Sequence, residues 1–117
     1  MRILICDDDA LMREQMQSLI TEYFEAEHVA CPEISCFPDG EALLADKGEK
    51  DILFLDVEMP GPDGIFVGNA LKKENENIII FIVTSYSKYL DDAMRFHVFR
   101  YLSKPVAQPS TLWRTAT

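Results

Sequence analysis

Residues that could handle phosphate chemistry follow short apolar runs at four places in the chain. Asp7 and Asp8 follow residues 3–6, Asp56 follows residues 51–55, Thr84 follows residues 78–83, and Lys104 follows residues 101–103. Short runs rich in Ile, Leu, Val and Phe, separated by helix-like stretches, are typical of parallel strands buried on both faces. Parallel sheets bind ligands beyond the carboxyl ends of their strands. The sequence therefore predicts three carboxylates, one hydroxyl and one amine along a common edge.

The three carboxylates predict a site for a cation. Like charges at close range repel each other unless a proton or a cation joins them. Mg²⁺ takes hard oxygen ligands, accepts one or two carboxylates directly and keeps positions for water or phosphate oxygens. We therefore predict that Asp7, Asp8 and Asp56 hold Mg²⁺. We interpret Asp9 as the cap of the helix that follows.

Asp56 is the candidate nucleophile, because a carboxylate can attack phosphorus and form an aspartyl phosphate. Phosphoryl transfer depends mainly on charge neutralisation, which Mg²⁺ and an ammonium group can supply. Lys104 provides the ammonium, and Thr84 can donate a hydroxyl hydrogen bond. Taken alone, each would be an ordinary solvated lysine or strand threonine. Their shared placement at strand ends supports the catalytic interpretation.

The elements that must position these residues alternate between strand and helix patterns. Apolar residues recur every three or four positions from Met12 to Phe24, which predicts one buried face of a first helix. The remaining patterns predict strands at residues 34–37 and 99–103, and helices near residues 40–44, 65–71 and 87–96. This order predicts one doubly wound α/β domain around a five-stranded parallel sheet.

Composition restricts the class of protein. The chain has 117 residues, 48% of them hydrophobic, which suits a single globular domain. Its net charge of -9 opposes direct binding to nucleic acid. It has neither an apolar run of membrane-spanning length nor a signal-peptide pattern, so we expect a cytoplasmic location and no membrane contact. Cys6, Cys31 and Cys36 predict free or packed thiols.

These residues resemble the receiver domains of two-component response regulators. The resemblance covers residues 2–106 and is carried by ILICDDD at residues 3–9, LDVEMPGPDG at 55–64, VTS at 83–85 and YLSKP at 101–105. It implies a flavodoxin-like fold with strand order 2-1-3-4-5. It also implies phosphorylation of Asp56, direct Mg²⁺ ligation by Asp8 and Asp56, and a contribution from Asp7 through water. The backbone carbonyl of Glu58 would complete the protein ligands.

The resemblance also implies how a signal is received and passed on. Thr84 and Lys104 would bind the phosphoryl oxygens, and Thr84 and Tyr101 would switch the surface formed by helix four, strand five and helix five. A sensor histidine kinase would be the phosphodonor, and the domain would promote its own phosphorylation and dephosphorylation. Residues 84–93 and 99–105 look most like receivers with LytTR-type DNA-binding output domains. Transcription regulation would then belong to a longer parent protein or a partner.

The C-terminal residues depart from the family pattern. Pro109 and several threonines disfavour a helix, and residues 107–117 provide no repeated apolar face for a complete fifth helix. We therefore divide the chain into a receiver domain at residues 1–106 and a short tail or incomplete fifth helix at residues 107–117. Apolar side chains left beside strand five and helix four predict a homodimer through the face formed by helix four, strand five and helix five. A tail folded back with Trp113 buried is the competing outcome.

Two other classes of protein share parts of this pattern. Phosphatases of the haloacid-dehalogenase type also use an aspartyl phosphate and Mg²⁺, but they usually have a second Asp where this chain has Glu58. Flavodoxin-like flavin binders share the fold order, but three aspartates after the first strand would repel a cofactor phosphate. Turnover of small phosphate esters would favour the first class, and flavin absorbance the second.

Overall fold

The computed structural model describes residues 1–84 and 99–103, with side chains described through Val83. The elements in chain order are β1 (Arg2–Cys6), α1 (Ala10–Ala26), β2 (Glu33–Phe37), α2 (Gly40–Ala45), β3 (Ile52–Leu55), α3 (Gly64–Glu74), β4 (Ile79–Thr84) and β5 (Phe99–Ser103). The five predicted strands and the first three predicted helices are confirmed, with small differences at their ends. The fourth helix predicted near residues 87–96 and the tail at residues 107–117 lie outside the described residues.

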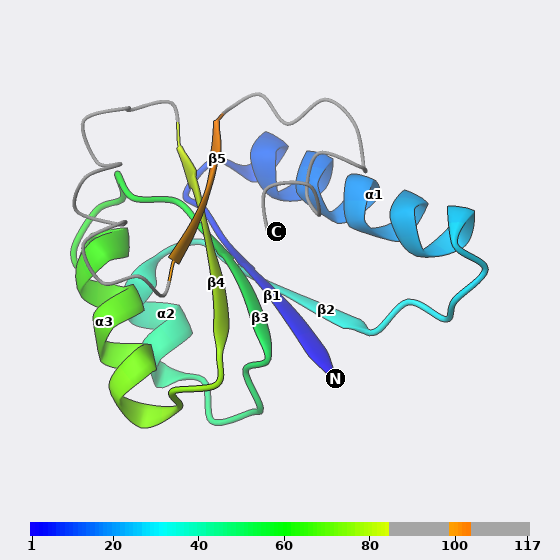
Figure 1. Ribbon diagram of the computed structural model, residues 1–117. Coiled ribbons are helices and arrows are strands. Elements are labelled where there is room, and N and C mark those ends of the chain that lie inside the picture. Colours follow the sequence, from blue (N-terminus) through cyan, green and yellow to red (C-terminus); the bar gives the residue numbers. More distant parts are fainter. Residues whose placement is uncertain (85–98, 104–117) are drawn as a thin grey trace.

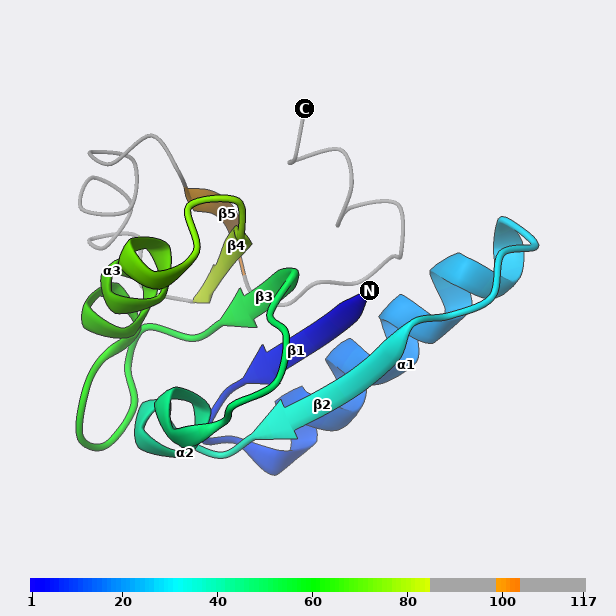
Figure 2. The ribbon, with the colours of Figure 1, turned by 90° about the horizontal axis from the view of Figure 1, so that it is seen from below.

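All five strands run parallel in one sheet with the order β2-β1-β3-β4-β5. The helix α1 lies on one face of the sheet, and α2 and α3 lie on the other (Figures 1 and 2). The predicted doubly wound fold is therefore confirmed. The chain turns from β2 on one side of β1 to β3 on the other, and such a reversal opens a crevice beyond the carboxyl ends of the strands.

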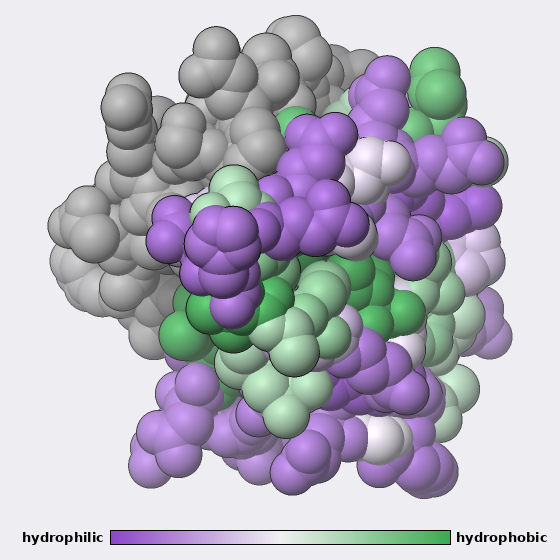
Figure 3. All heavy atoms as spheres, turned by 90° about the vertical axis from the view of Figure 1, so that its right-hand side faces the viewer, coloured by the Kyte–Doolittle hydropathy of each residue, from purple (hydrophilic) through white to green (hydrophobic). Residues whose placement is uncertain are grey.

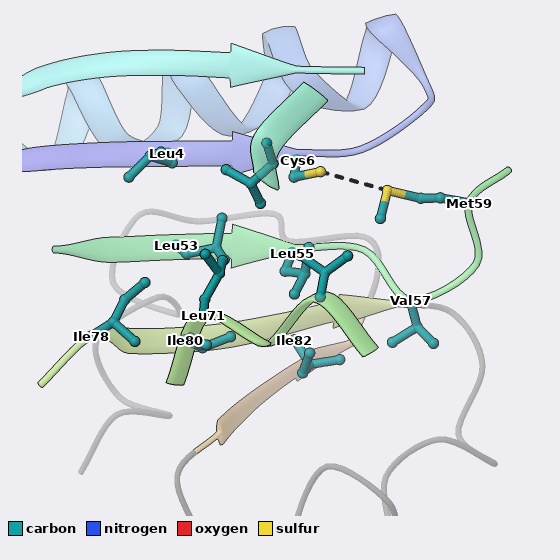
Figure 4. Close-up of a cluster of buried hydrophobic side chains, with 12 residues drawn as sticks. Leu4, Cys6, Leu53, Leu55, Val57, Met59, Leu71, Ile78, Ile80 and Ile82 are labelled. Carbon is teal, nitrogen blue, oxygen red and sulfur yellow. Dashed lines mark hydrogen bonds between the residues drawn. The ribbon is translucent and has the colours of Figure 1, made fainter. Parts of the chain in front are cut away.

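Side chains alternate along the strands and form a separate apolar layer on each face of the sheet. Towards α2 and α3, Leu4 and Cys6 of β1 pack with leucines of β3 and isoleucines of β4 (Figure 4). Towards α1, the rings of Phe54 and Phe81 stack across neighbouring strands, with centroids 4.9 Å apart and planes 9° apart. These layers make the strands a rigid base for the loops at their carboxyl ends.

A network around Arg2 fastens the opposite edge of the sheet, where the strands begin. The Arg2 guanidinium lies 2.6 Å from the carboxylate of Asp46 and also donates to the hydroxyl of Ser35. The Arg2 backbone amide donates to the Asp51 carboxylate at 2.8 Å. These contacts join β1 to β2 and to the segment between α2 and β3. They stabilise the sheet at the edge away from Asp7 and Asp56.

The two ends of α1 are formed by residues of different types. The Asp9 carboxylate accepts a hydrogen bond from the Leu11 amide, so the predicted role of Asp9 as the helix cap is confirmed. At the other end, His28 has a φ of 56°, in the left-handed region. The amides of His28 and Val29 donate to the carbonyls of Glu25 and Phe24, which is the Schellman pattern of a helix end.

Within residues 1–84 and 99–103, no helix has both the length and the apolar character needed to cross a membrane.

Candidate functional site

Three carboxylates meet where β1 and β3 end. Asp7 and Asp8 follow β1, Asp56 follows β3, and one carboxylate oxygen from each lies within 4.8 Å of the others. Asp7 and Asp56 are only 4% and 6% exposed, whereas Asp8 is exposed to solvent. The strands are neighbours in register, with Cys6 beside Leu55, so the residues that follow them must come together. The described residues thus bring together the three acidic side chains for which we predicted a cation.

Hydrogen bonds from three directions hold Asp7 in place. Its backbone amide donates to the Phe37 carbonyl of β2 at 3.1 Å, and its carboxylate accepts from the Asp9 amide at 2.9 Å. Its carbonyl accepts a hydrogen bond from the Arg13 guanidinium at 2.7 Å. Asp7 is therefore fixed to β2, to its own turn and to the first part of α1.

Asp56 is fixed by backbone contacts on both sides. Its amide donates to the Cys6 carbonyl at 2.9 Å, which continues the pairing of β1 with β3 beyond the strand. One oxygen of its carboxylate accepts from the Val57 amide at 2.9 Å, which fixes the rotation of the carboxylate. The Gly64 amide donates to the Val57 carbonyl, and this contact brings the start of α3 against the backbone of Asp56.

A contact between two sulfur atoms joins the end of β1 to the loop that follows Asp56. Cys6 immediately precedes Asp7, Met59 lies three residues after Asp56, and their sulfur atoms are 3.7 Å apart (Figure 4). Burial raises the pKa of the Cys6 thiol to about 12, and the carboxylates of Asp39, Asp7 and Asp56 add to this rise. Cys6 therefore stays a neutral thiol at physiological pH and acts by packing. All three cysteines are free thiols, in agreement with the prediction from their number.

The structure describes the other predicted site residues to different extents. The backbone of Thr84 ends β4 and pairs with Ser103 of β5, at the same edge of the sheet as Asp56. Tyr101 lies within β5, beside Ile82. Glu58 is an exposed residue of the loop after Asp56. Lys104 follows Ser103 in the chain and lies outside the described residues.

Two residues near the site, Arg13 and Met59, received no role from the sequence alone. Arg13 is four positions beyond Asp9, and nothing in a helical pattern shows that its side chain turns back towards Asp7. Met59 belongs to a loop motif of the sequence, and its contact with Cys6 joins residues 53 positions apart. Only the three-dimensional arrangement connects either residue to the acidic cluster.

Comparison with protein families gives one match over nearly the whole chain. Residues 3–115 match the family described as the response regulator receiver domain. Receiver domains bind Mg²⁺ at an acidic site, and this chain has an acidic cluster at the corresponding edge of its sheet.

Individual relatives agree with the family match. The chain is 33% identical to the transcriptional regulatory protein BtsR of Salmonella typhi over 92% of this chain and 43% of BtsR. It is 30% identical to the sensory transduction protein LytT of Bacillus anthracis over 90% of this chain and 42% of LytT. The chain thus spans about two fifths of the length of these relatives.

A solved structure supports the same assignment. The response regulator TrrA of Thermotoga maritima, in complex with Mg²⁺-BeF, superimposes with a TM-score of 0.77 and 30% identity, covering 90% of this chain and 87% of TrrA. The sheet order, the acidic cluster at its edge and the match over residues 3–115 agree with one another. This chain belongs to the response regulator receiver domain family, the signalling domains of two-component systems.

Proposed function

We propose that Asp56 receives a phosphoryl group and that Mg²⁺ binds beside it. The observation that carries this proposal is the meeting of the Asp56 carboxylate with those of Asp7 and Asp8 within 4.8 Å. Asp56 is nearly buried, and its carboxylate is oriented by the Val57 amide. A carboxylate held in one orientation at the carboxyl end of a strand is suited to in-line attack on phosphorus.

The transfer forms one bond and breaks another. A carboxylate oxygen of Asp56 attacks phosphorus, and the bond from phosphorus to the donor atom breaks. With a phosphohistidine donor, the leaving imidazole nitrogen keeps the electron pair of the broken bond. Hydrolysis later transfers the phosphoryl group to water and regenerates the carboxylate. We propose that the domain promotes both of these steps itself.

Asp8 and Asp56 are the proposed direct ligands of Mg²⁺, and Asp7 contributes through water. The backbone carbonyl of Glu58, in the loop after Asp56, is the remaining proposed protein ligand. Hard carboxylate and carbonyl oxygens fit this ion. When bound, Mg²⁺ would neutralise charge on the carboxylates and on the phosphoryl oxygens.

Thr84 and Lys104 are proposed to bind the phosphoryl oxygens. In support, Thr84 ends β4, the strand beside β3, and Ser103 ends β5 next to it. Lys104 comes directly after Ser103 in the sequence, which supports its proposed role beside Thr84. Recruitment of Thr84 by the new phosphoryl charge would be coupled to a change at Tyr101 of β5. The surface around β5 would then carry the signal.

A mass measurement tests phosphorylation at Asp56. The protein is incubated with acetyl phosphate and Mg²⁺, and the intact mass is followed for wild type, Asp56→Asn and Asp51→Asn. Asp51 is the matched control, because it lies at the other end of β3, where its carboxylate binds the Arg2 amide. Wild type and Asp51→Asn should each gain one phosphoryl group, and Asp56→Asn none. Equal gain in Asp56→Asn would contradict the proposal.

The proposed phosphodonor is the phosphohistidine of a sensor histidine kinase in the cytoplasm. The similarity to BtsR, a transcriptional regulatory protein, and to LytT, a sensory transduction protein, supports a transcriptional output of the LytTR type. That output would belong to a longer protein or to a partner. Direct binding of nucleic acid by this acidic domain is not part of the proposal, because its net charge is -9.

We also propose that residues 1–106 form the receiver domain and that residues 107–117 form a tail.

A further proposal is that two copies of the domain form a homodimer through the side that carries β5. In support of the dimer, Ile79 at the start of β4, the neighbour of β5, is 45% exposed. Figure 3, which shows the right-hand side of Figure 1, has hydrophobic atoms near the middle of that face, but it does not identify them with β5. Light scattering over a concentration series tests it, and a mass that stays monomeric before and after phosphorylation would exclude the dimer.

The phosphatase alternative is not favoured. Glu58 occupies the position where those enzymes usually have a second Asp, and its side chain is exposed. The receiver family match over residues 3–115 also favours a signalling domain over an enzyme with a separate substrate. Sustained hydrolysis of small phosphate esters would reverse this preference.

A further inference from the structure

Arg13, in the first turns of α1, reaches back to the loop that carries two of the three carboxylates. Its Nη1 atom donates a 2.7 Å hydrogen bond to the carbonyl of Asp7, and its side chain is half-buried. This carbonyl belongs to the peptide bond that joins Asp7 to Asp8. Because a peptide unit is planar, holding its oxygen fixes the direction in which the chain leaves Asp7 and enters Asp8. Arg13 thus contacts the backbone link between the two carboxylates.

The other hydrogen bonds described for this loop act on different atoms. The Asp7 amide is held by Phe37, and the Asp7 carboxylate is held by the Asp9 amide. The second of these bonds joins the Asp7 carboxylate to the Asp9 amide and therefore spans Asp8, but neither bond acts on the oxygen of the peptide between Asp7 and Asp8. Asp8 is exposed, so packing constrains its side chain little. The bond from Arg13 acts directly on the oxygen of the peptide between Asp7 and Asp8, and it comes from α1 and not from the loop itself.

The positive charge of Arg13 also affects the pKa values of two thiols at this end of the sheet. The guanidinium opposes the rise that burial produces in the pKa values of Cys6 and Cys36, the thiols at the ends of β1 and β2. A positive charge near a cation site disfavours the binding of a second cation. Arg13 therefore acts on Mg²⁺ affinity in two opposite ways. Its charge lowers the affinity, and its hydrogen bond raises the affinity by arranging the ligands.

We infer that Arg13 is a positioning residue, which holds the Asp7–Asp8 peptide in the orientation needed for Mg²⁺ binding and for phosphorylation of Asp56. This inference rests on the proposed function of the acidic cluster. The geometric contribution outweighs the unfavourable charge, because a hydrogen bond from a charged donor to a fixed carbonyl is strong. Partners that orient the ligands of a metal commonly change its affinity by about 10–100-fold when they are removed.

The sign of the change in Mg²⁺ affinity tests the inference. Arg13→Met removes both the hydrogen bond and the charge, and Arg13→Lys keeps the charge but loses the planar guanidinium. Lys73→Met is the charge-matched control, because Lys73 is an exposed residue near the end of α3. Backbone amide shifts are followed by NMR during a Mg²⁺ titration of each variant. Initial rates of phosphoryl uptake from acetyl phosphate are measured over the same Mg²⁺ range.

Arg13→Met should weaken Mg²⁺ binding by about tenfold, and Arg13→Lys by less. The half-saturating Mg²⁺ concentration for phosphorylation should rise by the same factor, with the rate at saturating Mg²⁺ changed much less. Lys73→Met should behave like wild type. Unchanged or tighter Mg²⁺ binding in Arg13→Met would overturn the inference, since loss of a charge alone acts in that direction.

Folding and the proposed function are controlled separately. A purely structural role would lower the thermal midpoint of metal-free Arg13→Met and leave the Mg²⁺ dependence of the folded protein unchanged, which would also overturn the inference. If Arg13→Met does not fold, Arg13→Lys and Arg13→Gln provide the same comparison. Absence of Mg²⁺-dependent phosphorylation in the wild type would instead refute the proposed function itself.

Discussion

Replacing Gly64 with alanine tests how closely α3 must approach the candidate phosphoacceptor. A Cβ atom at Gly64 would lie 2.2 Å from the backbone oxygen of Asp56 and 2.8 Å from the Cα atom of Val57. Both distances are far shorter than any normal contact with carbon. The atoms in the way belong to the backbone and cannot rotate aside as a side chain can. Either α3 or the segment after β3 must therefore move.

The size of the effect follows from these contacts. Overpacking a well-packed interior costs about 1–3 kcal/mol, and a clash with fixed backbone belongs at the upper end of that range. Alanine recovers roughly 0.5–1 kcal/mol by restricting the unfolded chain. We expect Gly64→Ala to lower the free energy of unfolding by about 2 kcal/mol. For a domain of this size, the midpoint of thermal unfolding should fall by roughly 8 °C.

Thermal and urea unfolding followed by circular dichroism measure this loss. Gly61→Ala is the matched control, because Gly61 has a φ of 77° but no atom within 4 Å of its added Cβ. The control should lose only the cost of the left-handed backbone, about 1 kcal/mol. Phosphorylation at a temperature where both variants are folded should slow in Gly64→Ala alone. Wild-type stability together with wild-type phosphorylation in Gly64→Ala would refute the argument from close packing.

Three further predictions concern pH, the end of α1 and the metal. The hydrogen bond from Arg2 is the main cause that lowers the pKa of Asp46 from 3.8 to about 2. Because the folded pKa is below the unfolded one, this stabilisation should be complete above about pH 4 and lost as pH falls towards 2, and urea titrations of Asp46→Asn should lack that part of the pH dependence. His28→Gly should raise the free energy of unfolding by roughly 0.5 kcal/mol, because glycine adopts a φ of 56° without strain. A lower urea midpoint for this variant would contradict the strain assigned to His28. Mg²⁺ at ten times its Kd should stabilise the wild type by about 1.4 kcal/mol, and in thermal unfolding Asp8→Ala should lose this gain while Asp9→Ala keeps it. Equal Mg²⁺ responses in the two variants would contradict the different roles assigned to them.

Local patterns were sufficient to predict the fold. The apolar runs before Asp7 and Asp56 required buried strands, and the alternation of strands with helices required a parallel sheet. Asp9 could be recognised as a cap because capping depends on residues only a few positions apart. Once the strands are parallel, their carboxyl ends share one edge, so the meeting of the carboxylates followed from strand order alone.

The contacts that fix the geometry of the site depended on tertiary structure. Arg13 binding the Asp7 carbonyl, Cys6 contacting Met59 and Gly64 packing against Asp56 each depend on where a loop or helix lies on the sheet. No periodic pattern encodes these partners, because each contact depends on a distance in space and not on spacing along the chain. Sequence by itself therefore determined which chemical groups reach this edge of the sheet, and packing between distant segments decided how they are held.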